Sequence, residues 1–258
     1  MTKIATELDD RGVFTITLQD EANRNVLSHA LTTELVAAMD RADTDPDVRV
    51  VVITNTGRIF CAGADLSERT ATPDQQQSPG NTDPLALFGR IQNSPKPWVG
   101  RIAGHAVAGG TGLAAALDIA IVHDDAKFGF TEVRLGLAPA LISVVCLPKM
   151  RRSDATAAFL RGQRFDGAEA ARLGLVSKAV GHDEIDAEVN AVVDDLLLGG
   201  PLALAAAKDV LRRIPTMHPD DALPWAAQRS ADLFASDEAA EGMAAYLEKR
   251  PPSWAPQA

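Results

Sequence analysis

Two glycine-rich segments could hold a ligand with their main-chain amides, and each follows an apolar stretch typical of a strand. Small side chains leave backbone N–H groups accessible to a bound molecule. The second segment also leads into a predicted helix, whose positive end would face developing negative charge. Two converging N–H groups would form an oxyanion hole, in which one donor contributes roughly 2.7–4 kcal/mol of transition-state stabilisation. The segments are Phe60-Cys61-Ala62-Gly63-Ala64-Asp65-Leu66 and Gly104-His105-Ala106-Val107-Ala108-Gly109-Gly110-Thr111-Gly112.

For either segment alone, the alternative is that its glycines only permit tight packing at a strand-to-helix turn. Known nucleotide-binding patterns do not fit, because no Gly-Lys-Ser/Thr ending is present and the glycines miss the dinucleotide-binding spacing. A Gly-x-Ser-x-Gly nucleophile elbow is also lacking. The segments therefore favour anion stabilisation or packing over phosphate binding or serine hydrolysis.

One carboxylate, Glu132, lies within an apolar, glycine-interrupted stretch at residues 128–139. Burial there would raise its pKa and suit the side chain to transfer protons near neutral pH. The alternative is that Glu132 pairs with Arg134 or caps a turn. Glu132 is therefore the candidate general acid/base.

Strands that alternate with helices must position these residues. Apolar or alternating stretches predict strands at residues 4–8, 13–18, 50–54, 98–102 and 119–122, and the third is expected to be buried on both faces. Helical spacing follows Ser28, a candidate N-cap, and resumes at 85–91 and 113–117. The polar stretch 67–84 is expected to be a surface loop. This alternation predicts a mixed α/β architecture.

The last third of the chain is predicted to be helical. Gly162 ends one helix, and Asp166 with Glu169 resembles a capping box for the next. An amphipathic helix follows Asp183, and further helices are expected at 202–213 and 237–250.

Composition limits the classes of function. The 258 residues carry a net charge of −10 and are 46% hydrophobic, which is typical of a globular protein of one large domain or of one domain with a small appendage. No apolar run approaches the roughly 20 residues of a membrane helix, and no signal-peptide pattern opens the chain. Acidity argues against nucleic acid as a partner, and two cysteines provide neither a disulfide framework nor a metal spacing. We expect a soluble, cytoplasmic protein.

The order of these motifs resembles the crotonase superfamily of enoyl-CoA hydratases and isomerases, from the Asn23-Arg24-Asn25 region to the tail. Each motif is moderately specific, and their order along nearly the whole chain is strongly specific. The resemblance is carried by residues 60–66, Gly109-Gly110, Phe128-Gly129 with Glu132, Glu241-Gly242-Met243 and Glu248-Lys249-Arg250-Pro251-Pro252.

The resemblance implies a fold, an assembly and a ligand. The fold is α/β, a crotonase-like (ClpP/crotonase) spiral of ββα turns at residues 1–195, followed by a C-terminal helical trimerisation region at 196–258. Homotrimers or dimers of trimers are expected. The ligand is an acyl-CoA thioester of fatty acid or lipid metabolism, with coenzyme A as part of the substrate and no metal or redox cofactor.

The resemblance also assigns roles to individual residues. Backbone N–H groups of Ala64 and Gly109 are expected to hold the thioester oxygen, with Glu132 as acid/base. The negative charge of the enolate forms only during reaction, so preorganised donors lower the barrier. The expected contacts with CoA involve Arg24, Ala62, Ala64, Asp65, Leu66 and Gly109, with Tyr246 and Lys249 touching the CoA of a neighbouring subunit.

The chain departs from the family at one catalytic position. Hydratases of the family place two glutamates around one water, and the first of them corresponds here to Gly112. Other candidate acids or nucleophiles are better explained by structural roles. Asp118, His105 and the His123-Asp124-Asp125 turn are expected to pack or to form polar turns, and Asp65 to hold its own loop. Nothing near Cys61 in the sequence activates its thiol.

Three hypotheses remain. The first is hydration of a 2-enoyl-CoA by Glu132 alone, which we favour. A branch of the family with Gly-Gly-x-Gly-Leu and Glu-Val-Arg-Leu-Gly-Leu-x-Pro-Ala is similar to this chain and is commonly assigned to enoyl- or methylglutaconyl-type CoA hydration. The second is Δ3-Δ2 double-bond isomerisation, which needs one base. The third is a non-catalytic acyl-CoA binding protein.

Overall fold

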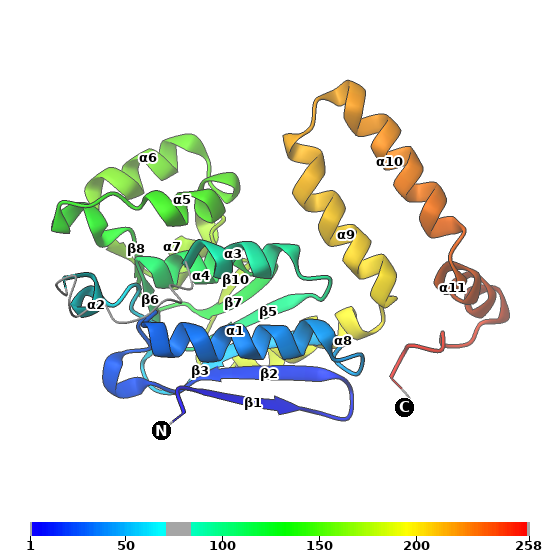
Figure 1. The fold of residues 1–258 in the computed structure, drawn as a ribbon, viewed down its shortest axis with the longest axis horizontal. Helices are drawn as coiled ribbons and strands as arrows, with labels where there is room; N and C mark the ends of the chain where they lie inside the picture. Colours follow the sequence, from blue (N-terminus) through cyan, green and yellow to red (C-terminus); the bar gives the residue numbers. More distant parts are fainter. Residues whose placement is uncertain (1, 71–83, 257–258) are drawn as a thin grey trace.

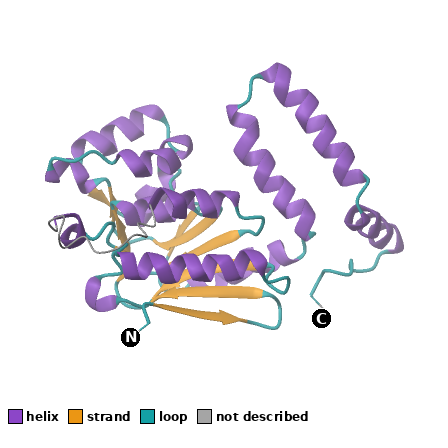
Figure 2. Ribbon diagram, in the orientation of Figure 1, coloured by secondary structure: helices purple, strands orange, loops and turns teal. Residues whose placement is uncertain are grey.

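The computed structural model describes residues 2–70 and 84–256, and its strands form two sheets (Figures 1 and 2). The larger has the order β1-β2-β3-β5-β7-β10 and the smaller β4-β6-β8-β9. The larger comprises β1 (Ile4–Leu8), β2 (Val13–Leu18), β3 (Val50–Asn55), β5 (Trp98–Ile102), β7 (Ile119–His123) and β10 (Lys178–Val180). The smaller comprises β4 (Ile59–Cys61), β6 (His105–Val107), β8 (Phe128–Gly129) and β9 (Arg164–Phe165).

The chain winds as a spiral of ββα turns, as expected for the crotonase-like fold. In successive turns, one strand joins the larger sheet, the next joins the smaller sheet, and a helix returns the chain: β3, β4 and α3, then β5, β6 and α4, then β7, β8 and α5. Strands within β2-β3-β5-β7-β10 and within β4-β6-β8 are parallel, so equivalent strand ends meet at one edge of each sheet.

The helices cover the sheets and extend beyond them. They are α1 (His29–Thr44), α2 (Leu66–Thr70), α3 (Pro84–Asn93), α4 (Gly109–Ala116), α5 (Ala140–Cys146), α6 (Arg152–Arg161), α7 (Gly167–Arg172), α8 (Ile185–Leu197), α9 (Pro201–Arg213), α10 (Pro219–Phe234) and α11 (Asp237–Glu248). Short 3-10 turns are η1 (Glu21–Asn23), η2 (Thr131–Leu135), η3 (Leu147–Lys149) and η4 (Ile214–Thr216).

Strand β3 is buried on both faces, as its unbroken apolar sequence predicts. Val51 and Ile53 join the main hydrophobic core, whereas Val50 and Val52 join a second core beneath α8. The period of two along a strand directs alternate side chains to opposite faces, so both faces of the larger sheet exclude water at this strand.

Several predicted helix ends are confirmed by their caps. The hydroxyl of Ser28 accepts a hydrogen bond from the N–H of Leu31 at the start of α1, and Asp166 accepts one from Glu169 at the start of α7. Gly162, in the left-handed region, ends α6. These local polar contacts satisfy N–H groups that an uncapped helix leaves unpaired.

The two glycine-rich segments contain more regular structure than their composition predicts. Residues 59–61 form β4 and residues 105–107 form β6, and helix α4 begins at Gly109 instead of near 113. The prediction was wrong there because glycine is a poor helix former in isolation, whereas close packing requires it here. A Cβ added to Gly110 would lie 2.0 Å from the carbonyl oxygen of Cys61.

The expected polar loop at 67–84 is only partly described. Its first residues belong to α2 and its last to α3, while residues 71–83 lie outside the described residues. Helix α5 is an additional element that the sequence patterns did not predict, whereas α10 lies in the last third of the chain, which was predicted to be helical without bounds for this helix.

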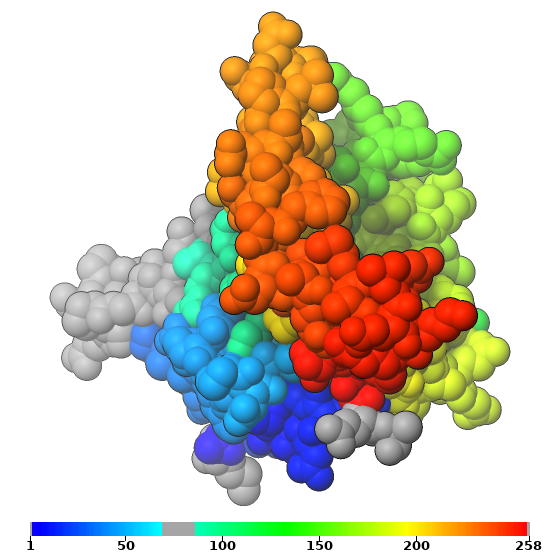
Figure 3. All heavy atoms as spheres, turned by 90° about the vertical axis from the view of Figure 1, so that its right-hand side faces the viewer, coloured from blue at the N-terminus to red at the C-terminus, as the bar shows by residue number. Residues whose placement is uncertain are grey.

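The last three helices, α9 to α11, extend away from the sheets (Figure 1). The C-terminal part of the chain, orange to red, forms the face seen in Figure 3. Helix α8 runs to Leu197 and buries Val189, Val193 and Leu197, so a boundary between 195 and 196 falls within this helix. The division into a core and a trimerisation region stays a prediction.

Among the described residues, no single helix has the length and apolarity to cross a membrane. Ile185–Leu197 and Pro201–Thr216 reach this length and apolarity only when taken together, and a bend of 108° separates them.

Candidate active site

Three neighbouring parallel strands of the smaller sheet position the candidate active site. Strand β4 leads to Ala64, β6 leads to Gly109, and β8 leads to Glu132. The amide of Ala108 also donates to the carbonyl oxygen of Gly129 at 2.9 Å, which ties the turn after β6 to the end of β8. Ligands of α/β folds bind outside the carboxyl ends of parallel strands, and the predicted oxyanion and acid/base residues follow such ends.

The turns that carry Ala64 and Gly109 are in direct contact. A Cβ added to Gly63 would lie 2.9 Å from the nitrogen of Gly109, and one added to Gly109 would lie 3.5 Å from the nitrogen of Ala64. Gly63 has a φ of +90°, which disfavours any side chain at this position. The two amides are therefore neighbours in space, and only glycine allows this approach.

Backbone strain at Ala108 accompanies this arrangement, and sequence reasoning missed it. Ala108 has a φ of 51°, in the left-handed region that a non-glycine residue rarely adopts, and it is the N-cap of α4. Such residues cost of order 1–3 kcal/mol and cluster at functional sites. The strained turn makes Gly109 the first residue of α4, so its N–H belongs to the positive helix end.

Both amides are available to a ligand. Within residues 2–70 and 84–256, neither the N–H of Ala64 nor that of Gly109 donates a hydrogen bond, and both residues are partly exposed. An unpaired backbone donor needs water or a ligand as its partner. The arrangement can therefore hold one oxygen atom between two amides.

Glu132 lies in η2 with a half-buried side chain. Its Oε2 atom is buried and has no hydrogen-bond partner, and no ion pair joins Glu132 to Arg134 among the described residues. Loss of hydration raises the pKa of this carboxyl, partly offset by a hydrogen bond from its own amide. The side chain is not tied to Arg134, and its raised pKa suits it to accept and return a proton near neutral pH.

Apolar atoms occupy the space beside Gly112. A Cβ added there would lie 2.4 Å from Cγ2 of Ile142, in α5, and 3.2 Å from Cζ of Phe88, in α3. Both side chains are buried. Apolar side chains therefore form a wall beside Gly112, the position predicted to correspond to the family's first glutamate. Sequence reasoning missed this wall because its residues lie far apart in the chain.

The other candidate acids have structural contacts. Asp118 accepts a hydrogen bond from the N–H of Trp98 at 2.7 Å and pairs with Lys208, and Nδ1 of His105 accepts one from the N–H of Lys127. Asp65 accepts from both the N–H and the hydroxyl of Ser67, which confirms that it holds its own loop. Burial raises the pKa of the Cys61 thiol to about 12, so the thiol is inert.

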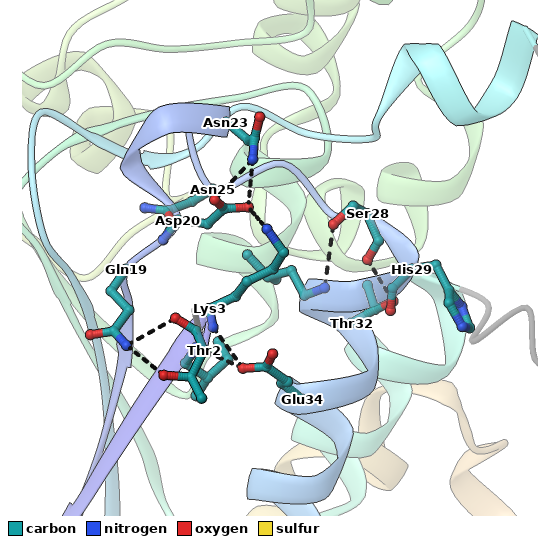
Figure 4. A network of polar contacts seen from close by, with 12 residues as sticks. Thr2, Lys3, Gln19, Asp20, Asn23, Asn25, Ser28, His29, Thr32 and Glu34 are labelled. Atoms are coloured by element: carbon teal, nitrogen blue, oxygen red, sulfur yellow. Dashed lines mark hydrogen bonds and ion pairs between the residues drawn. The ribbon is translucent and has the colours of Figure 1, made fainter.

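The segment that carries Arg24 is fixed against the first glycine-rich segment. Figure 4 shows Asp20 and Asn25 within the polar network that holds it. Asn25 is fully buried, accepts from the N–H of Asp20 and donates to the carbonyl of Ile59 in β4. The carbonyl of Arg24 in turn accepts from the N–H of Ala62 at 3.1 Å. Arg24 and Ala62 thus lie side by side, close to Ala64, and their contact with CoA stays a prediction.

The remaining predicted CoA residues are distributed over both ends of the molecule. Asp65 and Leu66 lie at the start of α2, near the oxyanion turns. Tyr246 and Lys249 lie on and just after α11, at the opposite end of the long axis (Figure 1). Tyr246 is 82% exposed. One chain does not bring these two groups together, so contact of Tyr246 and Lys249 with the CoA of a neighbouring subunit stays a prediction.

A spiral of ββα turns that brings two unpaired amides together after two neighbouring strands, with a half-buried carboxyl group after the next strand, is typical of enzymes of the crotonase type. The model of the family "Enoyl-CoA hydratase/isomerase" matches residues 9–257. The chain belongs to this family.

Known relatives resemble the chain over nearly its whole length. It is 33% identical to Enoyl-CoA hydratase EchA19 of Mycobacterium tuberculosis, over 93% of this chain and 91% of that protein. It is 32% identical to 2,3-dehydroadipyl-CoA hydratase of Escherichia coli, over 94% of this chain and 94% of that protein. The crystal structure of an enoyl-CoA hydratase of Mycobacterium smegmatis superposes with a TM-score of 0.91 at 30% identity, covering 98% of this chain and 99% of that one.

Proposed function

We propose that the protein is an enoyl-CoA hydratase that adds water across the C2=C3 bond of a 2-enoyl-CoA thioester. The observations that carry the proposal are the meeting of the Ala64 and Gly109 amides after β4 and β6, and the position of Glu132 after the neighbouring strand β8, with a buried Oε2 that has no partner among the described residues. The names of the relatives described above also support hydration. Coenzyme A is part of the substrate, and neither a metal nor a redox cofactor takes part.

Ala64, Gly109 and Glu132 have separate roles in the proposed reaction. The thioester oxygen binds between the N–H groups of Ala64 and Gly109. Glu132 accepts a proton from water as the water oxygen attacks C3, and the electron pair of the double bond moves to the thioester oxygen as an enolate. Glu132 then returns a proton to C2. The amides stabilise charge that exists only along the reaction path, so they lower the barrier without tightening substrate binding.

The raised pKa of Glu132 fits this double role. A carboxylate of ordinary pKa is a weak base toward water, and its conjugate acid would be scarce near pH 7. Burial brings the pKa upward, so one group can both remove and return a proton.

The wall of Ile142 and Phe88 beside Gly112 favours a second candidate, Δ3-Δ2 enoyl-CoA isomerisation. Isomerisation moves a proton from C2 to C4 and needs no water, so an apolar surface in place of the first glutamate suits it. Glu132 would be the only acid/base in this reaction.

Turnover of two substrates tests the proposal. The purified enzyme is incubated with a short 2-enoyl-CoA and, separately, with a 3-enoyl-CoA, and the absorbance of the conjugated thioester is followed. Hydration predicts loss of this absorbance with the first substrate. A gain with the second substrate and no loss with the first would replace hydration by isomerisation, and no change in either, with CoA thioesters still bound, would leave an acyl-CoA binding protein.

We further propose that the chain assembles as a homotrimer or as a dimer of trimers through its C-terminal region. Large apolar side chains of α9 to α11 are exposed in the single chain, including Leu211, Leu223 and Leu247. Such a surface is typical of an interface. The position of Tyr246 and Lys249, far from α2 of their own chain, suits contact with the CoA of a second subunit.

The cytoplasmic location of the protein also stays a prediction.

A further inference from the structure

Two histidines and an aspartate come together at one edge of the larger sheet, on residues to which the proposed function assigns no role. His123 is the last residue of β7 and pairs in register with Val180 of β10. His182 follows two residues after β10, and Asp125 lies in the turn between β7 and β8. One potential ligand atom from each of these three side chains lies within 4.8 Å of the other two.

His123 is a buried histidine with an unpaired ring nitrogen. Its side chain is buried, with the residue only 3% exposed, and its Nδ1 atom has no hydrogen-bond partner among the described residues. Leaving a buried polar atom unpaired costs about 1–3 kcal/mol. The ring of His182 lies 3.5 Å from that of His123 between centroids, and Nε2 of His182 lies 3.4 Å from Oδ1 of Asp125. A shared ligand would satisfy all three side chains.

We propose that His123, His182 and Asp125 bind a divalent transition-metal ion of the zinc class, with solvent completing its coordination. Imidazole nitrogens and a carboxylate oxygen are zinc ligands at about 2.0–2.2 Å, which places neighbouring ligand atoms of a tetrahedral site about 3.4 Å apart. The His182–Asp125 separation already has this value. Both of these side chains are largely exposed, so they can move toward the buried His123 and admit the ion from solvent.

The surrounding charges favour a cation. Arg101 of β5 is the nearby positive group, and Asp186 of α8 engages its guanidinium at 2.5 and 3.1 Å. Asp124 and Asp125 add negative charge from the turn. Burial, with the neighbouring His182 as a smaller contribution, lowers the pKa of His123, so this imidazole stays neutral and able to bind metal to lower pH than an isolated one.

The position of the ion gives it a structural role. Strand β10 is the edge strand of the larger sheet, and the ion would join its end to the end of β7. Through Asp125 it would also fix the turn that leads into β8, the strand before Glu132. The ion would therefore stabilise the sheet edge without touching substrate, independently of the proposed function.

Titration with Zn²⁺ tests the proposal on the purified full chain in a chelator-free buffer at pH 7.5. Calorimetry is expected to show one ion per chain, Co²⁺ to give the visible absorption bands of a tetrahedral site, and saturation with Zn²⁺ to raise Tm by roughly 5 °C. The affinity should fall at least about tenfold at pH 5.5, because protons compete for the imidazoles.

Single substitutions at the exposed ligands keep the buried His123 in place. His182→Ala and Asp125→Asn should each weaken Zn²⁺ binding by at least about tenfold. His218→Ala is the matched control, because His218 forms an exposed pair with Asp220 at 3.4 Å that has no second histidine. It should bind as tightly as the unsubstituted chain. Equal affinity of His182→Ala and the unsubstituted chain, or an equal loss in His218→Ala, would overturn the proposal. Unchanged Zn²⁺ binding in Glu132→Gln would separate this site from the active site.

Discussion

The two halves of the candidate active site are built by different means. The oxyanion half consists of backbone amides from the turns at Gly63–Ala64 and Ala108–Gly109, where the closest approaches at Gly63 and Gly109 are to backbone atoms. The proton-transfer half consists of side chains, namely Glu132 and the wall of Ile142 with Phe88 beside Gly112.

This difference indicates that the proton-transfer chemistry of the enzyme can change more easily than its oxyanion hole. The oxyanion half depends on packing that any added side chain would disrupt, so it is common to every reaction proposed here. The proton-transfer half depends on a few side chains, so one substitution can change the reaction. The predicted replacement of a catalytic glutamate by Gly112 would be such a change, and the two proposed reactions, hydration and isomerisation, would differ only in this half.

The largest expected effect follows from removing the carboxylate. Glu132→Gln keeps the size of the side chain and removes its ability to exchange protons, so kcat should fall by about 10²–10⁴. Binding of a saturated acyl-CoA, measured by calorimetry, should be unchanged. Glu7→Gln, on the exposed face of β1, is the control and should keep full activity. A Glu132→Gln variant with normal kcat would remove Glu132 from the reaction.

A smaller loss is expected from the backbone half. Gly63→Ala places a methyl group 2.9 Å from the nitrogen of Gly109, at a φ of +90°, so the two turns must separate. We expect kcat to fall about 10²–10³, as after loss of one oxyanion donor. Steady-state kinetics with a folded variant, checked by circular dichroism, measures this effect. Normal kcat in such a variant would show that the two amides do not act together.

Alanine substitutions of two helical glycines, one in a crowded and one in an open environment, test the close packing of the apolar wall. Gly112→Ala should lower the free energy of unfolding by about 1–3 kcal/mol, because the new methyl group meets Ile142 at 2.4 Å. Gly89→Ala, in α3, meets nothing closer than 4.0 Å and should raise it by about 0.4–1 kcal/mol. Urea denaturation compares the two variants, and equal effects would contradict the close packing at Gly112.

The pH dependence of the carboxyl group gives a further, modest effect. Because burial raises the pKa of Glu132 above its usual range, turnover should begin to fall at a higher pH than for an exposed glutamate as the solution is acidified. The protonated form is favoured in the folded state, so its stabilising contribution is lost as pH rises through the folded pKa. Glu132→Gln should therefore unfold at the same or a higher Tm at pH 7.5. A lower Tm there would contradict the raised pKa.

The smallest effect is expected at the distant CoA residues. Lys249 has a φ of 55°, so Lys249→Gly removes the charge without straining the backbone. The KM for CoA thioesters should rise about two- to fivefold, as for loss of one exposed ion pair. The KM for pantetheine thioesters, which lack the nucleotide, should be unchanged. Equal changes for both substrates would remove Lys249 from nucleotide binding.

The sequence predicts the parts of the fold that local chemistry determines. The strands at 4–8, 13–18 and 98–102 and the cap at Ser28 follow from apolar patterns and side-chain-to-backbone contacts within a few residues. The glycine-rich turns could be recognised because their function needs small residues at fixed positions. The bounds of helix α10 could not be predicted in this way, because none of its residues is buried in the single chain and its apolar pattern therefore matches no core.

The parts of the site that tertiary contacts determine were not predictable. The strain at Ala108 depends on how β6 joins α4, and the wall at Gly112 brings together residues from α3, α4 and α5. The histidines at 123 and 182 are 59 positions apart in the sequence and meet only because β7 and β10 are neighbours. No local pattern encodes such contacts.

A crystal structure with a bound saturated acyl-CoA tests the central claim most directly. The thioester oxygen is predicted to lie about 2.7–3.1 Å from the nitrogens of both Ala64 and Gly109, with the Glu132 carboxyl facing C2 and C3 of the acyl chain. A thioester oxygen bound by only one of these amides or by neither, or a Glu132 side chain directed away from the acyl group, would contradict the account.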